Sequence, residues 1–302
     1  MSPHPDFKTV EASRPDWDTS SSFHLTKAAD PNWTYGSGAN HLRDEAEEGK
    51  AHVKIDPHEA GRPAPFNYKL LISAITPRPI GFISSRSGTG TDGPTAKETF
   101  NLAPFSYFNV INTDPPLFAV GISSSLSSSD KPAKDTLRNL AATRECTVSI
   151  ISEHFLEAAN ATSIDSPPDV SEWDISGLTP LFDCETVSTP RVREAVFTVE
   201  CVVESIREFD SRAKPGTKSG SLVVLEGTRF WVREDAINDE RNMVNTDVLK
   251  PVSRLGGISY GRTVQGVELP RPVFGKEVGR EGVEELKKNK EGGNGKTEAR
   301  LS

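Results

Sequence analysis

The chain of 302 residues carries a formal net charge of −8, with 35% hydrophobic and 7% aromatic residues. This acidic balance argues against nucleic-acid partners, whose phosphates are bound by clustered Lys and Arg, and the low apolar content indicates polar segments beside an ordinary core. We expect a soluble, cytoplasmic protein without membrane contact, because no apolar signal region begins the chain and no apolar stretch is long enough to span a bilayer.

Histidine and cysteine are poorly placed for catalysis or for metal binding. Five of the six histidines precede residue 60, which leaves only His154 for the expected core. The three cysteines, Cys146, Cys184 and Cys201, are odd in number and widely spaced, so neither a disulfide framework nor a zinc site is indicated. We therefore expect no metal site and assign no catalytic side chain.

The two ends of the chain differ in composition from its middle. Residues 1–60 mix polar residues with isolated aromatics and are expected to form a disordered or extended arm. Residues 273–302 are charged and rich in Gly, so we expect a disordered tail with at most one short helix, near residues 283–288. A single body at residues 61–272 is expected between them.

Six segments of this body are rich in Val, Ile, Leu and Phe and are predicted to be strands. They are residues 70–74, 78–85, 117–123, 146–151, 195–209 and 221–232. Two short helices are expected at residues 136–143, with Asp135 as the N-cap, and at residues 153–163. Because strands and helices do not alternate regularly, the body is predicted to be mainly β, as an antiparallel closed barrel with helical inserts.

A Gly-x-Gly-x-x-Gly pattern at Gly88, Gly90 and Gly93 has the spacing of a dinucleotide-binding fingerprint. That fingerprint needs a helix of useful length after it, since the pyrophosphate rests on the helix N-terminus. Pro94 follows at once, and Pro104 would break any helix that began there. We therefore interpret the three glycines as a flexible hairpin loop between strands.

Two segments carry polar groups that packing does not require. Residues 76–85 enter a strand through two prolines around Arg78 and end in the hydroxyls of Ser84 and Ser85, although composition favours a plain barrel strand with a surface arginine. Residues 101–108 offer backbone N–H groups, hydroxyls and an aromatic wall, which together suit an isoalloxazine ring, and the alternative is an ordinary strand with a turn. The residues of interest there are Asn101, Leu102, Ala103, Pro104, Phe105 and Ser106.

A third segment, residues 123–136, is rich in serine and ends at the start of an expected helix. Ser123 opens it, and Lys131, Lys134 and Thr136 lie at its end. Together with the free N–H groups of the first helical turn, these residues could bind a phosphate through the helix dipole and charge-assisted hydrogen bonds. The alternative is a flexible serine loop followed by a capped helix.

The order of several short motifs along the chain is specific, although each motif is weak singly. They are Y-K-L-L at 68–71, T-P-R-P-I at 76–80, N-L-A-P-F-S-Y-F at 101–108, D-P-P-L at 114–117, K-D-T at 134–136 and R-L-G-G-I-S-Y at 254–260. In this order they resemble the flavin reductase-like family, the FMN-binding split-barrel group that includes flavoredoxins. The resemblance spans residues 66–262 and leaves the arm and the insert at residues 88–100 outside the family pattern.

The resemblance implies a six-stranded antiparallel split barrel with Greek-key connections, usually a homodimer with FMN near the subunit interface. It implies that Arg78, Ser84 and Ser85 line the flavin pocket and that residues 101–106 hold the isoalloxazine. It further implies that Lys134, Asp135 and Thr136 hold the phosphate end. Arg254 and Tyr260 are weaker candidates.

The resemblance also implies the reaction. NADH or NADPH would donate hydride to FMN as a transient electron donor, and the acceptor would be a second flavin, a partner oxygenase, a ferric compound or oxygen. We expect FMN rather than FAD, because the sequence offers a site for one terminal phosphate and no second pyrophosphate loop. A carrier or sensor of FMN and a split-barrel oxidase of a small organic substrate, or one using haem, remain open alternatives.

Overall fold

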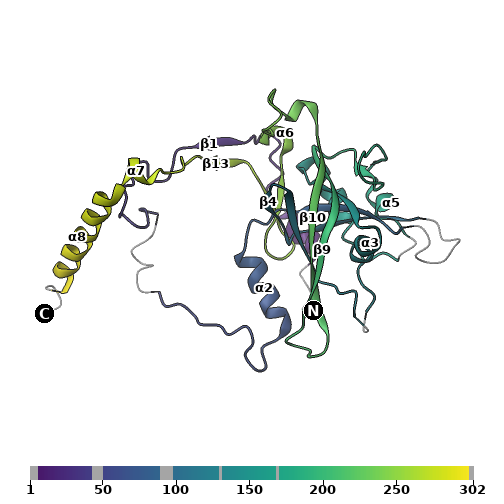
Figure 1. The fold of residues 1–302 in the computed structure, drawn as a ribbon, viewed down its shortest axis with the longest axis horizontal. Coiled ribbons are helices and arrows are strands. Elements are labelled where there is room, and N and C mark those ends of the chain that lie inside the picture. The colour runs from purple at the N-terminus through teal and green to yellow at the C-terminus, as the bar shows by residue number, and fades with distance from the viewer. Residues whose placement is uncertain (1–5, 43–49, 89–97, 129–130, 168–169, 299–302) are drawn as a thin grey trace. The chain divides into compact units, whose positions relative to one another are not determined.

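The computed structural model describes residues 6–42, 50–88, 98–128, 131–167 and 170–298. The chain divides into two compact units (Figure 1). The larger unit combines Met1–Phe23 with Asp56–Val264, and the smaller one combines His24–Ile55 with Gln265–Ser302. Each unit therefore contains segments from both the arm and the rest of the chain.

The larger unit is built on one antiparallel sheet of seven strands. In spatial order they are β3 (Phe100–Phe105), β2 (Gly81–Arg86), β6 (Glu145–Ile150), β9 (Phe197–Asp210), β10 (Lys218–Val232), β5 (Pro116–Ile122) and β4 (Phe108–Thr113). The connection from β5 to β6 crosses the long β9–β10 pair, so neighbours in the sheet are not always neighbours in sequence. This mainly antiparallel β architecture confirms the expected fold class.

The two outermost strands of this sheet, β3 and β4, are joined by Ser106 and Tyr107. Such a short link spans at most about 11 Å between the flanking residues, so the sheet has to curve until its two ends lie close together. No ladder joins β3 to β4 in the described part of the sheet. The result is a barrel left open along this line, which we call the seam (Ser106, Tyr107 and the facing Gly121 of β5).

Alternate residues of the central strands form the main core together with α3 (Asp135–Thr143). Val199, Cys201 and Val203 of β9 point into it, as the alternation in the sequence predicts, and Leu137 and Leu140 of α3 cover it. A second cluster lies beside it and is formed by Ile80, Phe82, Leu102, Ile151, Phe155, Ala159, Trp173, Leu178, Val192, Ala195 and Val252.

Short elements surround the sheet. The helices of the larger unit are α1 (Phe7–Ala12), α2 (Ala64–Ala74), α3, η2 (Glu153–Phe155), α4 (Leu156–Ala161), α5 (Glu172–Ser176), η3 (Glu234–Ala236) and α6 (Thr246–Leu249). Two small antiparallel pairs join β7 (Pro180–Leu181) to β8 (Arg191–Val192) and β11 (Val252–Arg254) to β12 (Tyr260–Arg262). In the view of Figure 1, α2 lies on one side of β9 and β10, and α3 and α5 lie on the other.

The structure corrects one expected strand and adds two strands that were not expected. Residues 70–74 are the last turn of α2 and not a strand, because Pro65 favours a helix start and only Ile72 of this apolar run is buried. Strands β3 and β4 were not predicted, since Pro104 and the polar residues of β4 hide their pattern. For this reason the sheet has seven strands rather than the expected six.

The arm and the tail contain more regular structure than expected. In the smaller unit, β1 (His24–Thr26) pairs in parallel with β13 (Gln265–Val267), and α7 (Phe274–Glu277) precedes α8 (Gly279–Glu298), a helix of 20 residues. Helix-forming Glu, Leu and Lys outweigh the glycines of the tail. In the larger unit, Trp17 lies under the Arg262 guanidinium at 4.3 Å, so an aromatic of the arm contacts the body.

The described stem of the glycine-rich insert has the geometry of a hairpin. β2 pairs with β3, and the Ser87 N–H donates to the Thr99 carbonyl oxygen at 2.9 Å. Gly88 adopts a φ of +68°, which a side chain would disfavour. Gly90 and Gly93 lie outside the described residues. The segment therefore connects two antiparallel strands and does not start a dinucleotide-binding helix.

One buried carboxylate holds the loop between β7 and β8 onto the sheet. Glu200 of β9 is 0% exposed and accepts hydrogen bonds from the Glu185 N–H at 3.0 Å, the Thr186 N–H at 2.6 Å and the Trp231 indole at 2.6 Å. The Thr186 hydroxyl donates at 2.5 Å. Burial alone would raise the pKa of Glu200, but these donors, led by the Thr186 hydroxyl, hold it below its ordinary value.

We predict that Glu200→Gln lowers the free energy of unfolding by roughly 1.5–3 kcal/mol at pH 7, because an amide cannot accept from all these donors. The lowered pKa means that this stabilisation is present above the ordinary glutamate pKa of about 4.3 and is lost as the pH falls through the folded value. Urea unfolding measured from pH 7 to pH 3 should therefore show a decreasing difference in the free energy of unfolding between variant and wild type. Glu204→Gln, an exposed residue of the same strand, is the control, and a wild-type result for Glu200→Gln would contradict this role.

Candidate functional site

A cavity of about 970 Å³ opens beside the seam of the larger unit. Its wall is formed by α2, β3, the seam, the serine-rich loop before α3, the first turn of α3, the loop before α5 and the turn between β9 and β10. These elements come from widely separated parts of the sequence. The open edge of the barrel is what brings them together.

Strand β3 supplies apolar side chains to the cavity wall, and the seam supplies main-chain groups and hydroxyls. Ala103, Pro104 and Phe105 of β3 line the cavity and continue into Ser106 and Tyr107. The Gly121 N–H donates to the Tyr107 carbonyl oxygen at 2.7 Å, and a Cβ at Gly121 would lie only 3.0 Å from the Cβ of Tyr107. Glycine at position 121 therefore allows the link of Ser106 and Tyr107 to pack closely against β5.

The start of α3 forms another part of the wall. Lys134 occupies the N-cap position, and its N–H donates to the Ser124 hydroxyl oxygen at 2.9 Å. Asp135 lies in the first turn and pairs with Arg138, so it is not the N-cap that we expected. The first-turn N–H groups have no intrahelical acceptor, and the helix dipole adds positive potential there. This end of the cavity is suited to an anion.

Thr136 and Asn101 connect the α3 start to β3. The Thr136 hydroxyl is buried and lies 2.9 Å from the Asn101 side chain. The amide of Asn101 satisfies its neighbours best with its oxygen accepting from that hydroxyl and its nitrogen donating to Glu172 at 3.3 Å. Glu172 also accepts from the Leu102 N–H at 3.3 Å and from the Ser166 hydroxyl. The network fixes the polar side of the wall.

The serine-rich loop is fastened and not free. Glu208 of β9 accepts from the Ser125 hydroxyl at 2.5 Å, the Leu126 N–H at 2.6 Å and the Ser127 hydroxyl at 2.5 Å. These hydrogen bonds, that of Ser125 first, lower the pKa of Glu208 to about 2. The carboxylate is therefore ionised at neutral pH and holds the loop against the β9–β10 pair.

Arg78 places a buried cation in the cavity wall. It is 8% exposed, and its guanidinium donates to the carbonyl oxygens of Ile72 at 2.6 Å, Ile75 at 2.7 Å and Leu255 at 2.9 Å. Its Nε–H has no acceptor among the described residues. The partners of the guanidinium are carbonyl groups and not a carboxylate, so no ion pair with a described residue offsets its charge, and the three hydrogen bonds tie the end of α2 to the segment after β11.

The sequence of residues 73–247 matches the family described as the flavin reductase like domain. The chain belongs to this family. Among solved structures, nitrilotriacetate monooxygenase component B from Bacillus cereus is 33% identical, with a TM-score of 0.62 over 73% of this chain and 100% of that chain. The 2-nitrobenzoate 2-nitroreductase NbaA of Pseudomonas fluorescens is 28% identical, with a TM-score of 0.60 over 74% of this chain and 98% of that chain.

A third structure bears on the fold of the flavin reductase-like domain. A Shewanella frigidimarina protein described as a flavin reductase with a split barrel domain superposes with a TM-score of 0.53 at 18% identity, over 71% of this chain and 94% of that chain. At this identity the likeness concerns the fold alone. The open seam of the sheet is thus the split of a split barrel, as the motif order implied.

Twelve of the sixteen candidate residues named from the sequence line the cavity of this flavin reductase-like domain. They are Arg78, Asn101, Ala103, Pro104, Phe105, Ser106, Ser123, Lys131, Lys134, Asp135, Thr136 and Arg254. Their role in binding stays a prediction. Tyr260 does not line the cavity but packs under the Arg254 guanidinium at 4.4 Å.

Ser84, Ser85 and Leu102 are not among the residues that line the cavity, and their part in flavin binding stays a prediction. Each is 0% exposed. Strand β2 lies between β3 and β6 and is covered on both faces, with Phe82 in one core cluster and Ile83 in the other. The Ser85 hydroxyl oxygen instead accepts from the Asn139 side chain at 3.1 Å.

Sequence reasoning missed several lining residues, namely Tyr107, Ser124, Glu172, Lys214 and Lys218. Tyr107 stands within a quoted motif and could have been included. Glu172 and the two lysines belong to segments without a recognisable motif. Only the fold brings them to the cavity.

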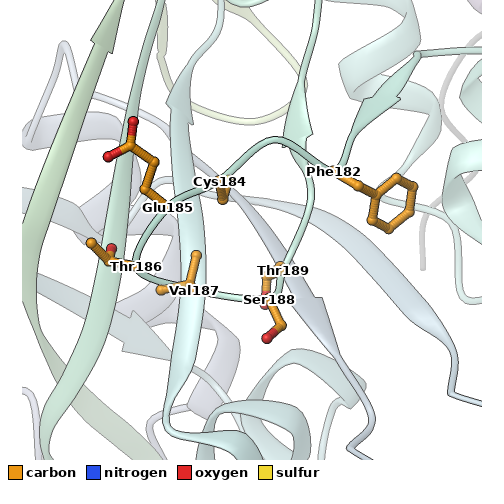
Figure 2. Close-up of a pocket in the computed structure, with 7 residues that line it drawn as sticks. All are labelled: Phe182, Cys184, Glu185, Thr186, Val187, Ser188 and Thr189. Carbon is orange, nitrogen blue, oxygen red and sulfur yellow. The ribbon is translucent and has the colours of Figure 1, made fainter.

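A smaller hollow of about 360 Å³ lies inside the loop between β7 and β8 (Figure 2). Its one thiol, Cys184, has its pKa raised to about 12, chiefly by burial, so it stays protonated and is a poor nucleophile. Cys146 and Cys201 are buried free thiols. Within the described residues no His, Cys, Asp or Glu cluster could hold a metal, and no helix could cross a membrane.

We predict that Glu208→Gln loosens the serine-rich loop. Losing the ionised acceptor should weaken hydrogen bonds worth about 1.5–3 kcal/mol and so accelerate amide exchange at Leu126 and Ser127 roughly ten- to a hundredfold. Hydrogen–deuterium exchange measured by NMR would give the rates. Glu204→Gln is the matched control, and unchanged protection of both amides in Glu208→Gln would show that the loop does not depend on this carboxylate.

Proposed function

We propose that the protein is an FMN-dependent oxidoreductase that takes hydride from NADH or NADPH. The observation that supports this most is the composition of one cavity, which joins the apolar seam wall to the anion-binding start of α3. A flavin mononucleotide has the same two parts, a flat ring and a terminal phosphate. Membership of the flavin reductase-like family supports a flavin as the ligand.

The residues of the cavity fit FMN. The main-chain groups and hydroxyls of the seam would hold the ring, and Lys134 with the first-turn N–H groups of α3 would hold the phosphate. Asn101, oriented by Thr136 and Glu172, would offer a fixed polar group at the wall. The Nε–H of Arg78, without an acceptor in the described structure, is a further donor for the ligand.

A bound flavin supplies a ring that accepts hydride and passes it on, so the protein needs no catalytic acid, base or metal of its own. The protein would contribute position and charge. Arg78 keeps a permanent positive charge in the wall, which favours a ligand that gains negative charge on reduction. The open seam would leave room for a nicotinamide ring to approach.

We propose a partner oxygenase as the acceptor system, supported by the likeness to a protein named as a monooxygenase component. A second flavin, a ferric compound or oxygen could equally accept electrons from the reduced flavin at the open seam. The likeness to a protein named as a 2-nitrobenzoate 2-nitroreductase favours a second candidate, direct reduction of a small aromatic compound. Assays with added FMN, oxygen, ferric citrate and 2-nitrobenzoate would rank these acceptors.

We also propose a homodimer. The exposed apolar side chains of the larger unit support it, namely Phe66, Tyr68, Leu70 and Leu71 of α2, Ile75 directly after α2, and Val110 and Ile111 of β4. Apolar groups on this scale usually contact another protein surface. Light scattering at micromolar concentration measures the assembly directly.

The reaction is tested without oxygen. We expect NADH or NADPH to bleach the visible band of the FMN-loaded protein within seconds, because a flavin held at the open seam would leave one face within reach of a nicotinamide ring. Dithionite gives the fully reduced reference spectrum. If dithionite bleaches the band and neither nicotinamide donor does, the protein is a flavin carrier or sensor and not a reductase.

We predict that Lys134→Ala weakens FMN binding roughly ten- to a hundredfold, because it removes a hydrogen bond to an ionised phosphate worth about 1.5–3 kcal/mol. Fluorescence titration with FMN and with riboflavin separates phosphate from ring contacts, and only FMN should be affected. Lys69→Ala, an exposed lysine of α2 that does not line the cavity, is the control. Equal FMN affinity in Lys134→Ala and wild type would show that the flavin phosphate does not bind to Lys134 at the start of α3.

A further inference from the structure

The turn between β9 and β10 lines the same cavity as the expected flavin residues, through Ser211, Lys214, Thr217, Lys218 and Ser219. Nothing in the flavin mononucleotide requires it. We propose that this turn, together with Lys131, forms a second anion subsite that binds the adenosine-side phosphate of a dinucleotide. The inference rests on the proposed function, because it names what occupies the cavity beside the flavin phosphate.

The turn is a defined structure and not a loose loop. The Ser211 N–H donates to the Thr217 carbonyl oxygen at 2.8 Å, and the Lys214 N–H donates to the Ser211 hydroxyl oxygen at 3.0 Å. The Thr217 hydroxyl donates to the Lys214 carbonyl oxygen at 2.8 Å, and Gly216 adopts the positive φ of +83° that the turn requires. The backbone of Lys214 is therefore fixed, and its ammonium is free to reach a ligand.

The hairpin that carries this turn is bound to the serine-rich loop. The Ser221 hydroxyl donates to the Ser124 carbonyl oxygen at 2.8 Å, and Glu208 holds Ser125 and Ser127. Gly220 packs closely against β5, since a Cβ added at this position would lie only 3.0 Å from the Ile122 carbonyl oxygen. The turn and the start of α3 are thus held in a fixed relation across the cavity.

The charges of the cavity exceed what one monophosphate needs. Seven cationic and three acidic side chains line its described wall, although the whole chain carries a net charge of −8. Arg138 pairs with Asp135, and Lys218 pairs with Asp210 at 2.7 Å. Lys131, Lys134 and Lys214 take no part in the ion pairs of the described residues.

The positions of these three lysines assign them to two different anions. Lys134 belongs to the helix start that suits the flavin phosphate. Lys131 and Lys214 remain for a second anion, and each phosphate of a dinucleotide pyrophosphate carries one negative charge that attracts ammonium groups through charge-assisted hydrogen bonds. The cavity volume of about 970 Å³ is near the upper end of the roughly 300–1,000 Å³ range of ligand pockets, which leaves space for a second nucleotide half.

Two dinucleotides carry such a phosphate, the nicotinamide donor and FAD. The test uses the full chain with the Lys131→Ala/Lys214→Ala double variant. Arg212→Ala, an exposed residue of the same turn that does not line the cavity, is the matched control. Thermal unfolding by circular dichroism should show equal stability in all three proteins.

The expected result is a rise of roughly ten- to a hundredfold in the KM for NADPH or in the Kd for FAD, with the Kd for FMN unchanged within about twofold. A change in the NADPH arm assigns the subsite to the donor, and a change in the FAD arm assigns it to the flavin dinucleotide. Unchanged values for both overturn the proposal. An equal loss of FMN affinity also overturns it, because the lysines would then belong to the flavin phosphate site.

Direct calorimetry keeps this inference separate from the proposed function. Adenosine 2′,5′-bisphosphate and ADP are titrated into wild type and the double variant without flavin or electron donor. Binding to wild type that is lost in the double variant supports the subsite even if no reductase activity is found. No binding of either probe to wild type at millimolar concentration overturns the subsite while leaving FMN binding and hydride transfer untouched.

Discussion

The short link between β3 and β4 is the constraint on which the site depends. Ser106 and Tyr107 hold the two ends of the sheet together without letting them pair, so the barrel has an open edge. Tyr107 lies on Gly121, and the serine-rich loop leaves β5 directly after Ile122. Chain connectivity therefore places the apolar residues of β3 beside the start of α3. A closed barrel would bury the same residues in its core.

Strand β9 holds two loops against the sheet through two carboxylates, one fully buried and one half-buried. Glu200 is fully buried and holds the loop between β7 and β8, whereas Glu208 is half-buried and holds the serine-rich loop. Both have lowered pKa values because several donors converge on each of them. A main-chain N–H cannot turn away from such an acceptor, so loops without regular structure acquire defined positions.

The sequence predicts those parts of the fold whose side-chain period is unambiguous. The alternation of Val199, Cys201 and Val203 identifies β9, and the ordered motifs identify the family and part of the cavity wall. Helix α2 escapes prediction because its apolar residues are exposed, and β2 misleads because both its faces are buried. The turn with Lys214 carries no local signal at all, since its position at the cavity follows from long-range strand pairing.

The chain as a whole is acidic, whereas seven cationic and three acidic side chains line the described wall of the cavity, and this contrast bears on the phosphate binding proposed above. Screening at physiological ionic strength confines electrostatic attraction to about 8 Å, so the overall charge of −8 has little influence inside the cavity. The attraction of the proposed phosphate ligands would therefore come from the cations of the cavity wall itself. Three carbonyl groups fix the guanidinium of Arg78, whereas the turn fixes only the backbone of Lys214. The distance between these two cations can therefore adjust through the Lys214 side chain, which would decide which phosphate compounds fit.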